Sequence, residues 1–597
     1  RTLNPPPPQG QKPGTSGLRK KTKLFMEGHY LHNFVQATFD SLPADELRGS
    51  TIVVSGDGRF YTPEAIQIIS KIAFANGVRR VWVGQDGLLS TPAVSAIIRN
   101  REDGAAYGGI ILTASHNPGG PENDFGIKYN TQNGGPAPEA LTNAIFERTK
   151  TIDSLKMLPD FPEVDISKIG RTIVKRADDS ADGVGADGVC DTIEVEVISN
   201  TEDYVAMFRS LFDIESLRAL VSRSDFSMVF DGMHGVAGPY AGAIFTDLLG
   251  APASCLRNCE PKPDFAGGHP DPNLVYAHDL VVAMGACESD GSIDDSVSAP
   301  EFGAACDGDA DRNMILGNKF FVTPSDSVAI IAANAHAIPF FASGLKGVAR
   351  SMPTSGALDR VAAKRGLPLF EVPTGWKFFG NLMDSAAVYG KEDYTPFLCG
   401  EESFGTGSNH VREKDGIWAV LSWLSILADR NRDASKEWVS IETIVRAHWA
   451  EFGRNVYSRY DYEGVESEKA ADVMAHLKTH IDAFAEAKAK DDSHTVPAGA
   501  FTLVNCDSFT YVDPVDGSVS ANQGLRFMME GGSRVVFRLS GTGSVGATIR
   551  VYFERYEPDA AQHDLPVATA LAPLVEAGLA LARLGELTGR DAPTVIT

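Results

Sequence analysis

Short apolar runs that alternate with amphipathic helical stretches are the feature that most constrains the fold of this chain. The run Thr51–Val54 is typical of a strand, residues 63–76 of a helix, and Arg80–Val83 of a second strand. A further helix from Thr91 leads into the apolar run 109–112. Because such units join parallel strands through crossover helices, the N-terminal part is predicted to be a layered α/β sheet.

The chain has 597 residues, which is too long for one hydrophobic core. The strand and helix alternation resumes near residue 200, with one helix expected over 204–220, and again near residue 323. After about residue 446, a long helical stretch, 467–489, is followed by alternating strands such as 534–539, a pattern typical of an α+β domain. We therefore predict α/β domains at 1–199, 200–322 and 323–445 and a smaller α+β domain at 446–597.

The composition excludes several classes of partner. With 54 basic and 78 acidic residues the net charge is −24, which repels nucleic acids and anionic membranes. Seven scattered cysteines form no paired zinc motif and no disulfide framework, which favours a reducing compartment. No apolar stretch is long enough to span a bilayer, and the start shows no signal-peptide layout. We expect a cytoplasmic protein with no nucleic-acid partner and no transmembrane segment.

The segment Thr113–Gly120 follows the apolar run 109–112 and ends in an Asn-Pro-Gly-Gly turn signal. Ser115 is therefore expected to be exposed where a strand ends. Ligands bind at such strand ends in open α/β sheets, so Ser115 and the neighbouring His116 are candidates for chemistry. A solvated polar turn is the alternative.

Asp307, Asp309 and Asp311 occupy alternate positions of a segment that we expect to be extended. Three carboxylates on one side repel one another unless a cation lies among them, and hard oxygen ligands of this kind suit Mg²⁺. A calcium EF-hand loop is disfavoured, because it requires glycine where Arg312 stands and glutamate where Asn318 stands. A solvated acidic loop is the remaining alternative.

Residues 541–546 match the pattern G-x-G-x-x-G after a predicted strand. A dinucleotide site would require a helix next, whereas residues 547–553 alternate like another strand. We instead expect a hairpin whose glycine amides and hydroxyls, flanked by Arg538 and Arg550, hold a phosphate. A plain hairpin is the alternative.

Three weaker motifs complete the set. Glu401 and Ser403 lie on a short glycine-bounded loop that could accept hydrogen bonds from sugar hydroxyls, and Thr374-Gly375 precedes a predicted helix. Lys414 stands in a charged turn, where a lysine is commonly just solvated. The basic segment 12–21 is either a flexible arm or a loop that brings Arg19 to a phosphate.

Taken in order, these motifs resemble the α-D-phosphohexomutase superfamily, and specifically its eukaryotic-type phosphoglucomutases. The resemblance covers nearly the whole chain, from Lys12–Arg19 to the terminal Thr594–Thr597. It implies three related α/β/α domains and a smaller C-terminal domain around a central cleft. It also implies a monomer or weak dimer that acts on small sugar phosphates.

The resemblance further implies a role for each motif. Ser115 would be the phosphorylated serine that gives and takes the phosphoryl group, and with Asp307, Asp309 and Asp311 it would bind Mg²⁺. Arg19 and Arg312 would stabilise the transferred charge, while Lys414, or alternatively His116 or Lys128, would move the proton of the sugar hydroxyl. Substrate would be bound by Thr374, Gly375, Glu401 and Ser403 at the sugar and by Arg538, Ser540, Thr542 and Arg550 at the second phosphate. The implied reaction interconverts glucose 1-phosphate and glucose 6-phosphate through glucose 1,6-bisphosphate.

Two segments, Arg176–Asp191 and Lys391–Phe397, have the character of insertions into the ordinary enzymes. They resemble those of parafusin, a phosphoglucomutase relative associated with secretory vesicles and calcium-triggered exocytosis. This likeness implies an alternative function, a regulated scaffold with peripheral vesicle association, with or without mutase activity.

Overall fold

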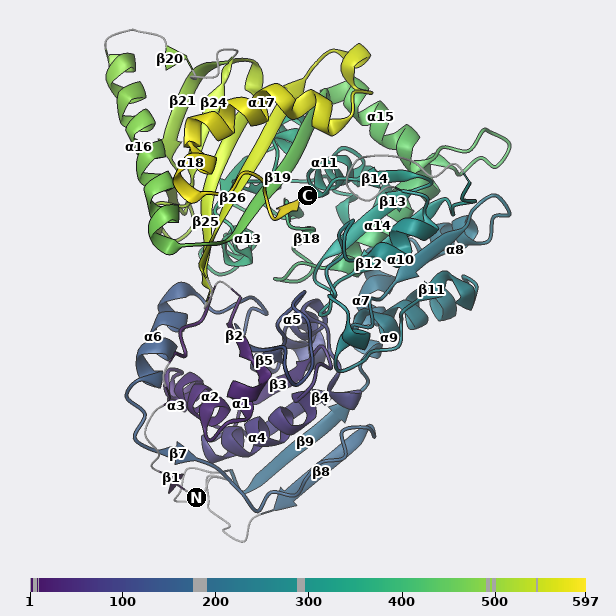
Figure 1. Ribbon diagram of the computed structural model, residues 1–597. Coiled ribbons are helices and arrows are strands. Elements are labelled where there is room, and N and C mark those ends of the chain that lie inside the picture. The colour runs from purple at the N-terminus through teal and green to yellow at the C-terminus, as the bar shows by residue number, and fades with distance from the viewer. Residues whose placement is uncertain are drawn as a thin grey trace.

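The computed structural model describes residues 2–3, 8, 10–14, 16–175, 190–286, 296–489, 494–495, 501–543 and 546–597. Figure 1 shows the N-terminal sheet at the bottom of the molecule and the C-terminal sheet at the top, with two further sheets between them along the chain. Predicted α/β organisation is confirmed, and each unit builds its own sheet.

The N-terminal sheet has the strand order β2-β6-β5-β3-β4-β9-β8. Its four central strands, β5, β3, β4 and β9, are parallel, as the alternating pattern predicts. The strands are β2 Leu18–Lys21, β3 Thr51–Gly56, β4 Arg80–Gly84, β5 Ala106–Leu112, β6 Asp124–Thr131, β8 Gly170–Lys175 and β9 Thr192–Ile198. The helices are α1 Thr22–Met26, α2 Tyr30–Asp40, α3 Ala44–Leu47, α4 Thr62–Ala75, α5 Thr91–Asn100 and α6 Glu139–Thr149, and β1 Thr2–Leu3 pairs with β7 Leu155–Lys156.

The second sheet has the order β11-β10-β12-β13-β14. Its strands are β10 Met228–Asp231, β11 Leu256–Arg257, β12 Phe302–Cys306, β13 Asn313–Gly317 and β14 Phe320–Val322, with helices α7 Glu202–Leu211, α8 Ile214–Val221, α9 Ala237–Ala241 and α10 His278–Ala283. The single helix expected over 204–220 is wrong. Phe212 is extended, and the Asp213 side chain caps a new helix by accepting a hydrogen bond from the Ser216 N–H at 3.1 Å.

The third sheet has the order β16-β15-β17-β18. Its strands are β15 Gly347–Ser351, β16 Leu369–Val372, β17 Phe397–Glu401 and β18 Gly405–Ser408. The helices are α11 Pro324–Ala333, α12 Ala357–Arg365, α13 Trp376–Met383, α14 Gly416–Arg430 and α15 Ile441–Phe452. Helix α14 is almost completely buried, which explains its lack of a polar face.

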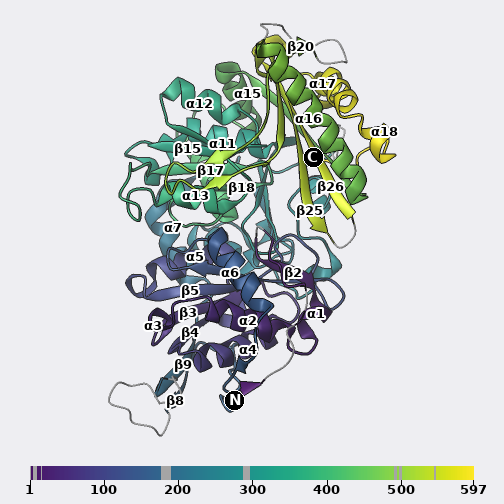
Figure 2. The ribbon, with the colours of Figure 1, turned by 90° about the vertical axis from the view of Figure 1, so that its left-hand side faces the viewer.

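The C-terminal sheet is antiparallel, with the order β20-β21-β24-β25-β26-β19-β27. Its long helix α16 spans Ser467–Ala489, as predicted, and packs with α17 Val567–Ala582 and α18 Leu584–Thr588. The strands are β19 Arg454–Val465, β20 His494–Thr495, β21 Thr502–Ser508, β24 Leu525–Met529, β25 Arg534–Gly543, β26 Gly546–Glu557 and β27 Val595–Ile596, and β22 Tyr511–Val512 pairs with β23 Val519–Ser520. The β25–β26 hairpin points toward the N-terminal domain (Figures 1 and 2).

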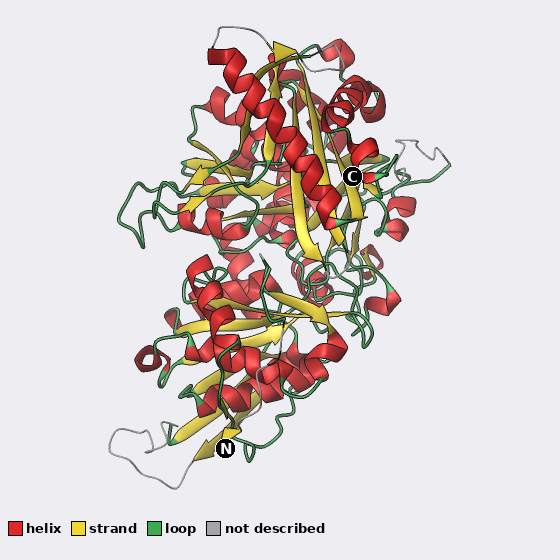
Figure 3. Cartoon of the chain, turned by 60° about the vertical axis from the view of Figure 1, so that its left-hand side comes forward, coloured by secondary structure: helices red, strands yellow, loops and turns green. Residues whose placement is uncertain are grey.

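The domains share hydrophobic packing. One large core cluster joins residues of the first three units, and another joins Ala349 and Trp376 of the third unit to Val536 and Tyr552 of the fourth. Buried side chains of neighbouring domains therefore pack against one another, and Figure 3 shows their helices and strands side by side. None of the helices in the described ranges combines the length and apolar character that crossing a membrane requires.

Candidate active site

The turn after β5 holds Ser115 in a left-handed conformation with φ of +54°. The Ser115 N–H donates to Thr113 Oγ1 at 2.7 Å, and its carbonyl accepts a hydrogen bond from Arg59 Nη2 at 2.9 Å. The expectation that Ser115 is exposed is wrong, because only 2% of it is accessible. The second domain covers the turn so closely that a Cβ at Gly308 would lie 2.6 Å from the Ser115 carbonyl oxygen.

A buried ion pair that the sequence motifs did not include supports this turn. Arg59 Nη2 lies 2.8 Å from Asp57 Oδ2, and both side chains are completely buried. Asp57 Oδ2 also accepts a hydrogen bond from Thr113 Oγ1 at 2.6 Å. These residues follow the end of β3, the same edge of the sheet from which Ser115 comes, and their position at a strand end was the available signal.

The carboxylates of Asp307, Asp309 and Asp311 converge as predicted, with one oxygen of each within 4.8 Å of the others. Their segment is a tight turn, however, and the expected extended conformation is wrong. Asp307 Oδ1 accepts hydrogen bonds from the N–H groups of Asp311 and Arg312, both at 3.0 Å, and Ala310 has a φ of +59°. The chain thus curls around Asp307 and directs all three side chains inward.

The donor set of this cluster fits a hard divalent cation. All three aspartates are buried, and Asp309 Oδ1 accepts no hydrogen bond from any described residue. Burial, followed by the charges of Asp309 and Asp311, raises the pKa of Asp307 well above its usual range. A cation among the carboxylates would satisfy the unpaired oxygen and offset the mutual repulsion.

Ser115 adjoins the cluster, because its Oγ donates to Asp307 Oδ2 at 2.9 Å. The N-terminal domain makes a second contact through Thr91, whose Oγ1 donates to Asp309 Oδ2 at 2.7 Å. The serine and the three carboxylates therefore form one polar centre at the junction of two domains.

Arg19 and Arg312 lie near this centre. Burial lowers the pKa of Arg19, and the neighbouring charges of Asp309 and Arg312 act on it as well. The Nε atoms of both arginines are buried, with no hydrogen-bond partner among the described residues, and Arg312 Nη1 lies 3.2 Å from Asp271 Oδ1. Arg312 Nε also lies 3.9 Å from Asp307 Oδ2. Guanidinium donors that make no hydrogen bond beside a carboxylate cluster suit an anionic ligand.

Three candidate proton carriers have different surroundings. Lys414 Nζ lies 3.3 Å from Asp311 Oδ1, and His116 Nδ1 lies 3.3 Å from Ser115 Oγ. Burial, followed by the charge of Arg312, lowers the pKa of His116 well below its usual range, so its ring is neutral. Lys128 is instead paired with Glu413 at 2.9 Å, which leaves Lys414 as the lysine in contact with the carboxylate cluster.

Glu401 is the last residue of β17 and Ser403 lies on the loop that leads to β18, where Ser403 Oγ donates to Glu401 Oε2 at 2.9 Å. Burial raises the pKa of Glu401, and the positive charge of Lys414 opposes this rise. Glu401 is therefore within electrostatic range of Lys414, one of the candidate proton carriers. Gly375 directly precedes α13 and has a φ of +131°, a conformation that favours glycine. The adjacent Thr374 Oγ1 is buried with no hydrogen-bond partner among the described residues.

Glu402, on the same loop, was not among the predicted site residues. Its Oε2 accepts a hydrogen bond from Ser351 Oγ at 2.9 Å and lies 3.4 Å from Thr354 Oγ1. The pKa of Arg538 is raised, because the effects of Tyr552 and Glu402 outweigh burial, which lowers it. Arg538 of the C-terminal domain therefore lies within electrostatic range of Glu402.

The hairpin expected for residues 538–550 is confirmed, because β25 and β26 are antiparallel neighbours. Arg538 and Arg550 are register partners and so project from the same face of the sheet. Arg459 of β19 pairs in register with Tyr552, two residues from Arg550, which puts a third arginine on that face. Finding Arg459 requires the pairing of two strands far apart in sequence. The side chains of Ser540 and Thr542 lie outside the described residues.

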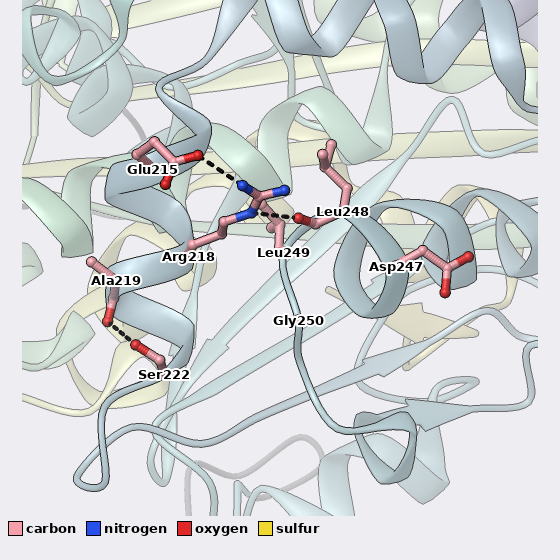
Figure 4. A pocket seen from close by; sticks show the side chains of 8 residues that line it. All are labelled: Glu215, Arg218, Ala219, Ser222, Asp247, Leu248, Leu249 and Gly250. Atoms are coloured by element: carbon pink, nitrogen blue, oxygen red, sulfur yellow. Dashed lines mark hydrogen bonds and ion pairs between the residues drawn. The ribbon is translucent and has the colours of Figure 1, made fainter.

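A separate hollow lies on the second domain between α8 and residues 247–250 (Figure 4). Arg218 crosses it, with Nη1 2.7 Å from Glu215 Oε1 and Nε donating to Leu248 O at 2.8 Å. Arg218 is already paired with Glu215, and none of the predicted site residues lines this hollow. The centre formed by Ser115 and the three aspartates therefore remains the candidate active site.

Comparisons with known proteins follow the same division of the chain. Residues 10–156, 202–319 and 324–450 match the family models for phosphoglucomutase/phosphomannomutase alpha/beta/alpha domains I, II and III, and residues 454–594 match the model for the phosphoglucomutase-1 C-terminal domain. The chain belongs to the phosphoglucomutase/phosphomannomutase family. The three related α/β/α domains and the separate C-terminal domain expected from the resemblance are therefore confirmed.

Individual members of the phosphoglucomutase/phosphomannomutase family match over their full length. The chain is 58% identical to a cytoplasmic phosphoglucomutase of Bromus inermis over 597 residues, 99% of this chain and 98% of that relative. It is 57% identical to a cytoplasmic phosphoglucomutase of Pisum sativum over 596 residues, again 99% and 98%. The open form of the exocytosis-sensitive phosphoprotein pp63/parafusin, a phosphoglucomutase from Paramecium, matches with a TM-score of 0.88 and 51% identity over 100% of this chain and 99% of that one.

Proposed function

We propose that the protein is a phosphoglucomutase that interconverts glucose 1-phosphate and glucose 6-phosphate through a phosphoserine and glucose 1,6-bisphosphate. The observation that supports this most directly is the 2.9 Å hydrogen bond from Ser115 Oγ to Asp307 Oδ2, at the edge of the three-carboxylate cluster. A serine in that position is well suited to carry a phosphoryl group beside a cation.

Asp307, Asp309 and Asp311, together with phosphorylated Ser115, would hold one Mg²⁺. When bound, this ion would neutralise charge on the oxygens of the transferring phosphoryl group. The unpaired Asp309 Oδ1 supports this assignment, since a buried acceptor without a partner costs free energy.

In the first half-reaction, the bond between phosphorus and the Ser115 oxygen would break as a bond forms from phosphorus to a sugar hydroxyl oxygen. Lys414 would accept the proton of that hydroxyl at its uncharged Nζ, and Asp311 Oδ1 at 3.3 Å would stabilise the ammonium so formed. The ammonium would then give the proton to the Ser115 oxygen released from phosphorus. Arg19 and Arg312 would stabilise charge on the equatorial oxygens. The second half-reaction returns a phosphoryl group from the bisphosphate to Ser115.

The substrate would be held at two further places. Thr374, Gly375, Glu401 and Ser403 would orient the sugar, and Arg538, Arg550 and the hydroxyls of Ser540 and Thr542 would bind the phosphate that is not transferred. We add Arg459 to this second group, because its strand register places it on the same face as both other arginines. The bisphosphate would reverse its orientation between half-reactions.

We propose a cytoplasmic location, since the plant relatives are named cytoplasmic phosphoglucomutases, and a monomer or weak dimer. We also propose domain bounds of 1–199, 200–322, 323–445 and 446–597. Strand β9, Thr192–Ile198, supports the first bound because it pairs with β4 of the N-terminal sheet.

The likeness to parafusin keeps the vesicle scaffold as the second candidate, at 51% identity over the whole chain. Of its two supporting segments, residues 176–189 lie outside the described part of the chain. Residues 391–397 pack back on the protein, where Lys391 Nζ donates to Pro514 O at 3.1 Å and Lys346 Nζ lies 2.8 Å from Asp393 Oδ2. This packing gives the segment a structural role in addition to any contact with a partner.

The deciding experiment measures glucose 6-phosphate formation by the purified full chain, with glucose 1-phosphate, Mg²⁺ and catalytic glucose 1,6-bisphosphate. We expect turnover by the natural protein, none by Ser115→Ala, and unchanged turnover by the control Ser154→Ala, a half-buried serine whose Oγ donates to Asp153 outside the site. Normal turnover by Ser115→Ala would refute the mechanism. An inactive natural protein whose vesicle binding survives Ser115→Ala would favour the scaffold.

A further inference from the structure

Helix α16 of the C-terminal domain carries two histidines one turn apart, His476 and His480. Their Nε2 atoms lie 3.4 Å from each other, and the two rings meet at 85° with centroids 5.0 Å apart. Positions i and i+4 share one face of a helix, and both side chains are half-buried there. The two imidazoles therefore bring their Nε2 atoms together on one face of the helix.

The separation of these nitrogens equals that between two ligands of a tetrahedral metal ion. With zinc–nitrogen bonds of about 2.0–2.1 Å, two nitrogens at this spacing subtend close to the tetrahedral angle. Histidines spaced i, i+4 on a helix are also the arrangement that binds zinc in the H-E-x-x-H motif. A hydrogen bond between neutral rings is the competing explanation for the same geometry.

A carboxylate from another element approaches the pair. Helix α18 packs alongside α16 (Figures 1 and 2), and it carries Glu586. A hydrogen bond from Arg583 is the main cause that lowers the pKa of Glu586, and the charge of His476 contributes as well. Glu586 is therefore within electrostatic range of His476.

Glu586 must exchange one partner to complete such a site. Among the described residues, Asp307, Asp309 and Asp311 alone have three ligand atoms already within 4.8 Å, and Glu586 Oε2 accepts from Arg583 Nε at 2.7 Å. That ion pair is exposed, and exposed pairs stabilise proteins little, so exchanging it for a metal ion costs little free energy.

We propose that His476 and His480, with Glu586 as third ligand, form a site for a divalent transition-metal ion such as Zn²⁺ that links α16 to α18. Imidazole nitrogens select Zn²⁺ over Mg²⁺, whereas the oxygens of Asp307, Asp309 and Asp311 suit Mg²⁺. The ion would stabilise the C-terminal domain without taking part in phosphoryl transfer. This inference is independent of the proposed function.

The test titrates Zn²⁺ into the full chain by calorimetry, with Mg²⁺ in large excess so that the aspartate cluster is occupied throughout. We expect the natural protein to bind one Zn²⁺ that His480→Ala binds at least roughly tenfold more weakly. Alanine favours the helix, so α16 should remain folded, which circular dichroism checks. The control is His336→Ala, which removes a histidine of the third domain whose side chain is 64% exposed and whose Nε2 lies 3.5 Å from Asp429 Oδ2.

Thermal unfolding provides a second measurement. Zn²⁺ should raise the Tm of the natural protein and of His336→Ala but not that of His480→Ala, and a chelator should reverse the increase. Identical Zn²⁺ affinity and stoichiometry in the natural protein and His480→Ala would overturn the site. Unchanged affinity in Glu586→Gln would overturn the assignment of the third ligand.

Discussion

Lys128 Nζ lies 2.9 Å from Glu413 Oε1, so β6 of the N-terminal domain is joined to the residue that precedes Lys414 in the third domain. The pair is buried, and Asn130 Nδ2 donates to the same carboxylate oxygen at 2.8 Å. Lys128 is thus placed to fix the position of Lys414, which is a different role from moving a proton itself.

The first prediction separates these two roles. Lys128→Met should lower the Tm and the turnover, because an unpaired buried carboxylate costs about 3–5 kcal/mol. The double variant Lys128→Met/Glu413→Gln removes both charges and should regain most of the Tm and the turnover. Thermal unfolding and steady-state kinetics measure both. A double variant that regains stability but stays inactive would instead make Lys128 the proton carrier.

The second prediction concerns Thr91, which holds Asp309 across the first domain junction. Thr91→Val should raise the Mg²⁺ concentration for half-maximal activity roughly tenfold or more, because second-shell partners orient metal ligands. Thr91→Ser keeps the hydroxyl and should behave normally. As control, Thr38→Val removes a buried hydroxyl that donates to Phe34 O within α2. Equal Mg²⁺ dependence of Thr91→Val and the natural protein would contradict the prediction.

The third prediction tests Arg459 as a ligand of the phosphate that is not transferred. Arg459→Met should raise the KM for glucose 1-phosphate roughly tenfold or more with a smaller change in kcat, because this phosphate is held equally before and during transfer. Arg590→Met, in the same domain, removes an arginine that contacts Gly464 O and should leave KM unchanged. A normal KM for Arg459→Met would remove Arg459 from the site.

The fourth prediction is a pH dependence of stability. Burial raises the pKa of Asp326 to about 6, while the hydrogen bond from Trp449 and the charge of Arg454 oppose this. Since the folded pKa is the higher one, the stability that Asp326 contributes is present at low pH and is lost as the pH rises through about 6. The loss between pH 5 and pH 7.5 should be about 1.4 kcal/mol.

Asp326→Asn removes this titration and can still accept the Trp449 Nε1 hydrogen bond, which is 3.2 Å long. The Tm of Asp326→Asn should therefore increase relative to that of the natural protein as the pH is raised from 5 to 7.5. A pH-independent difference between the two Tm values would show that Asp326 does not titrate in this range.

Much of the fold could be predicted because its signals are local. The β3–α4–β4 unit and the 23-residue helix α16 follow from periodicity within their own segments. The break between α7 and α8 was missed because the apolar periodicity continues across it. It depends on the Asp213 cap and on packing that the local pattern does not contain.

The site was predictable as a set of motifs but not as an arrangement. The spacing of Asp307, Asp309 and Asp311 is by itself enough to predict a cation site. The burial of Ser115 depends on Gly308 from another domain, and the inclusion of Arg459 depends on the register of β19 with β26. Both require contacts between residues that lie far apart in sequence.

The hydrogen bonds that hold the backbone of Ser115 limit which groups can move during the reaction. Its amide and carbonyl are held by Thr113 and by Arg59, which is itself locked to Asp57. A phosphoryl donor fixed in this way cannot swing between the two ends of a hexose. Under the proposed mechanism the sugar would have to turn around instead, so the protein would have to loosen its contacts with the bisphosphate without releasing it to solvent. The retention of this intermediate would then set the number of turnovers between rephosphorylations.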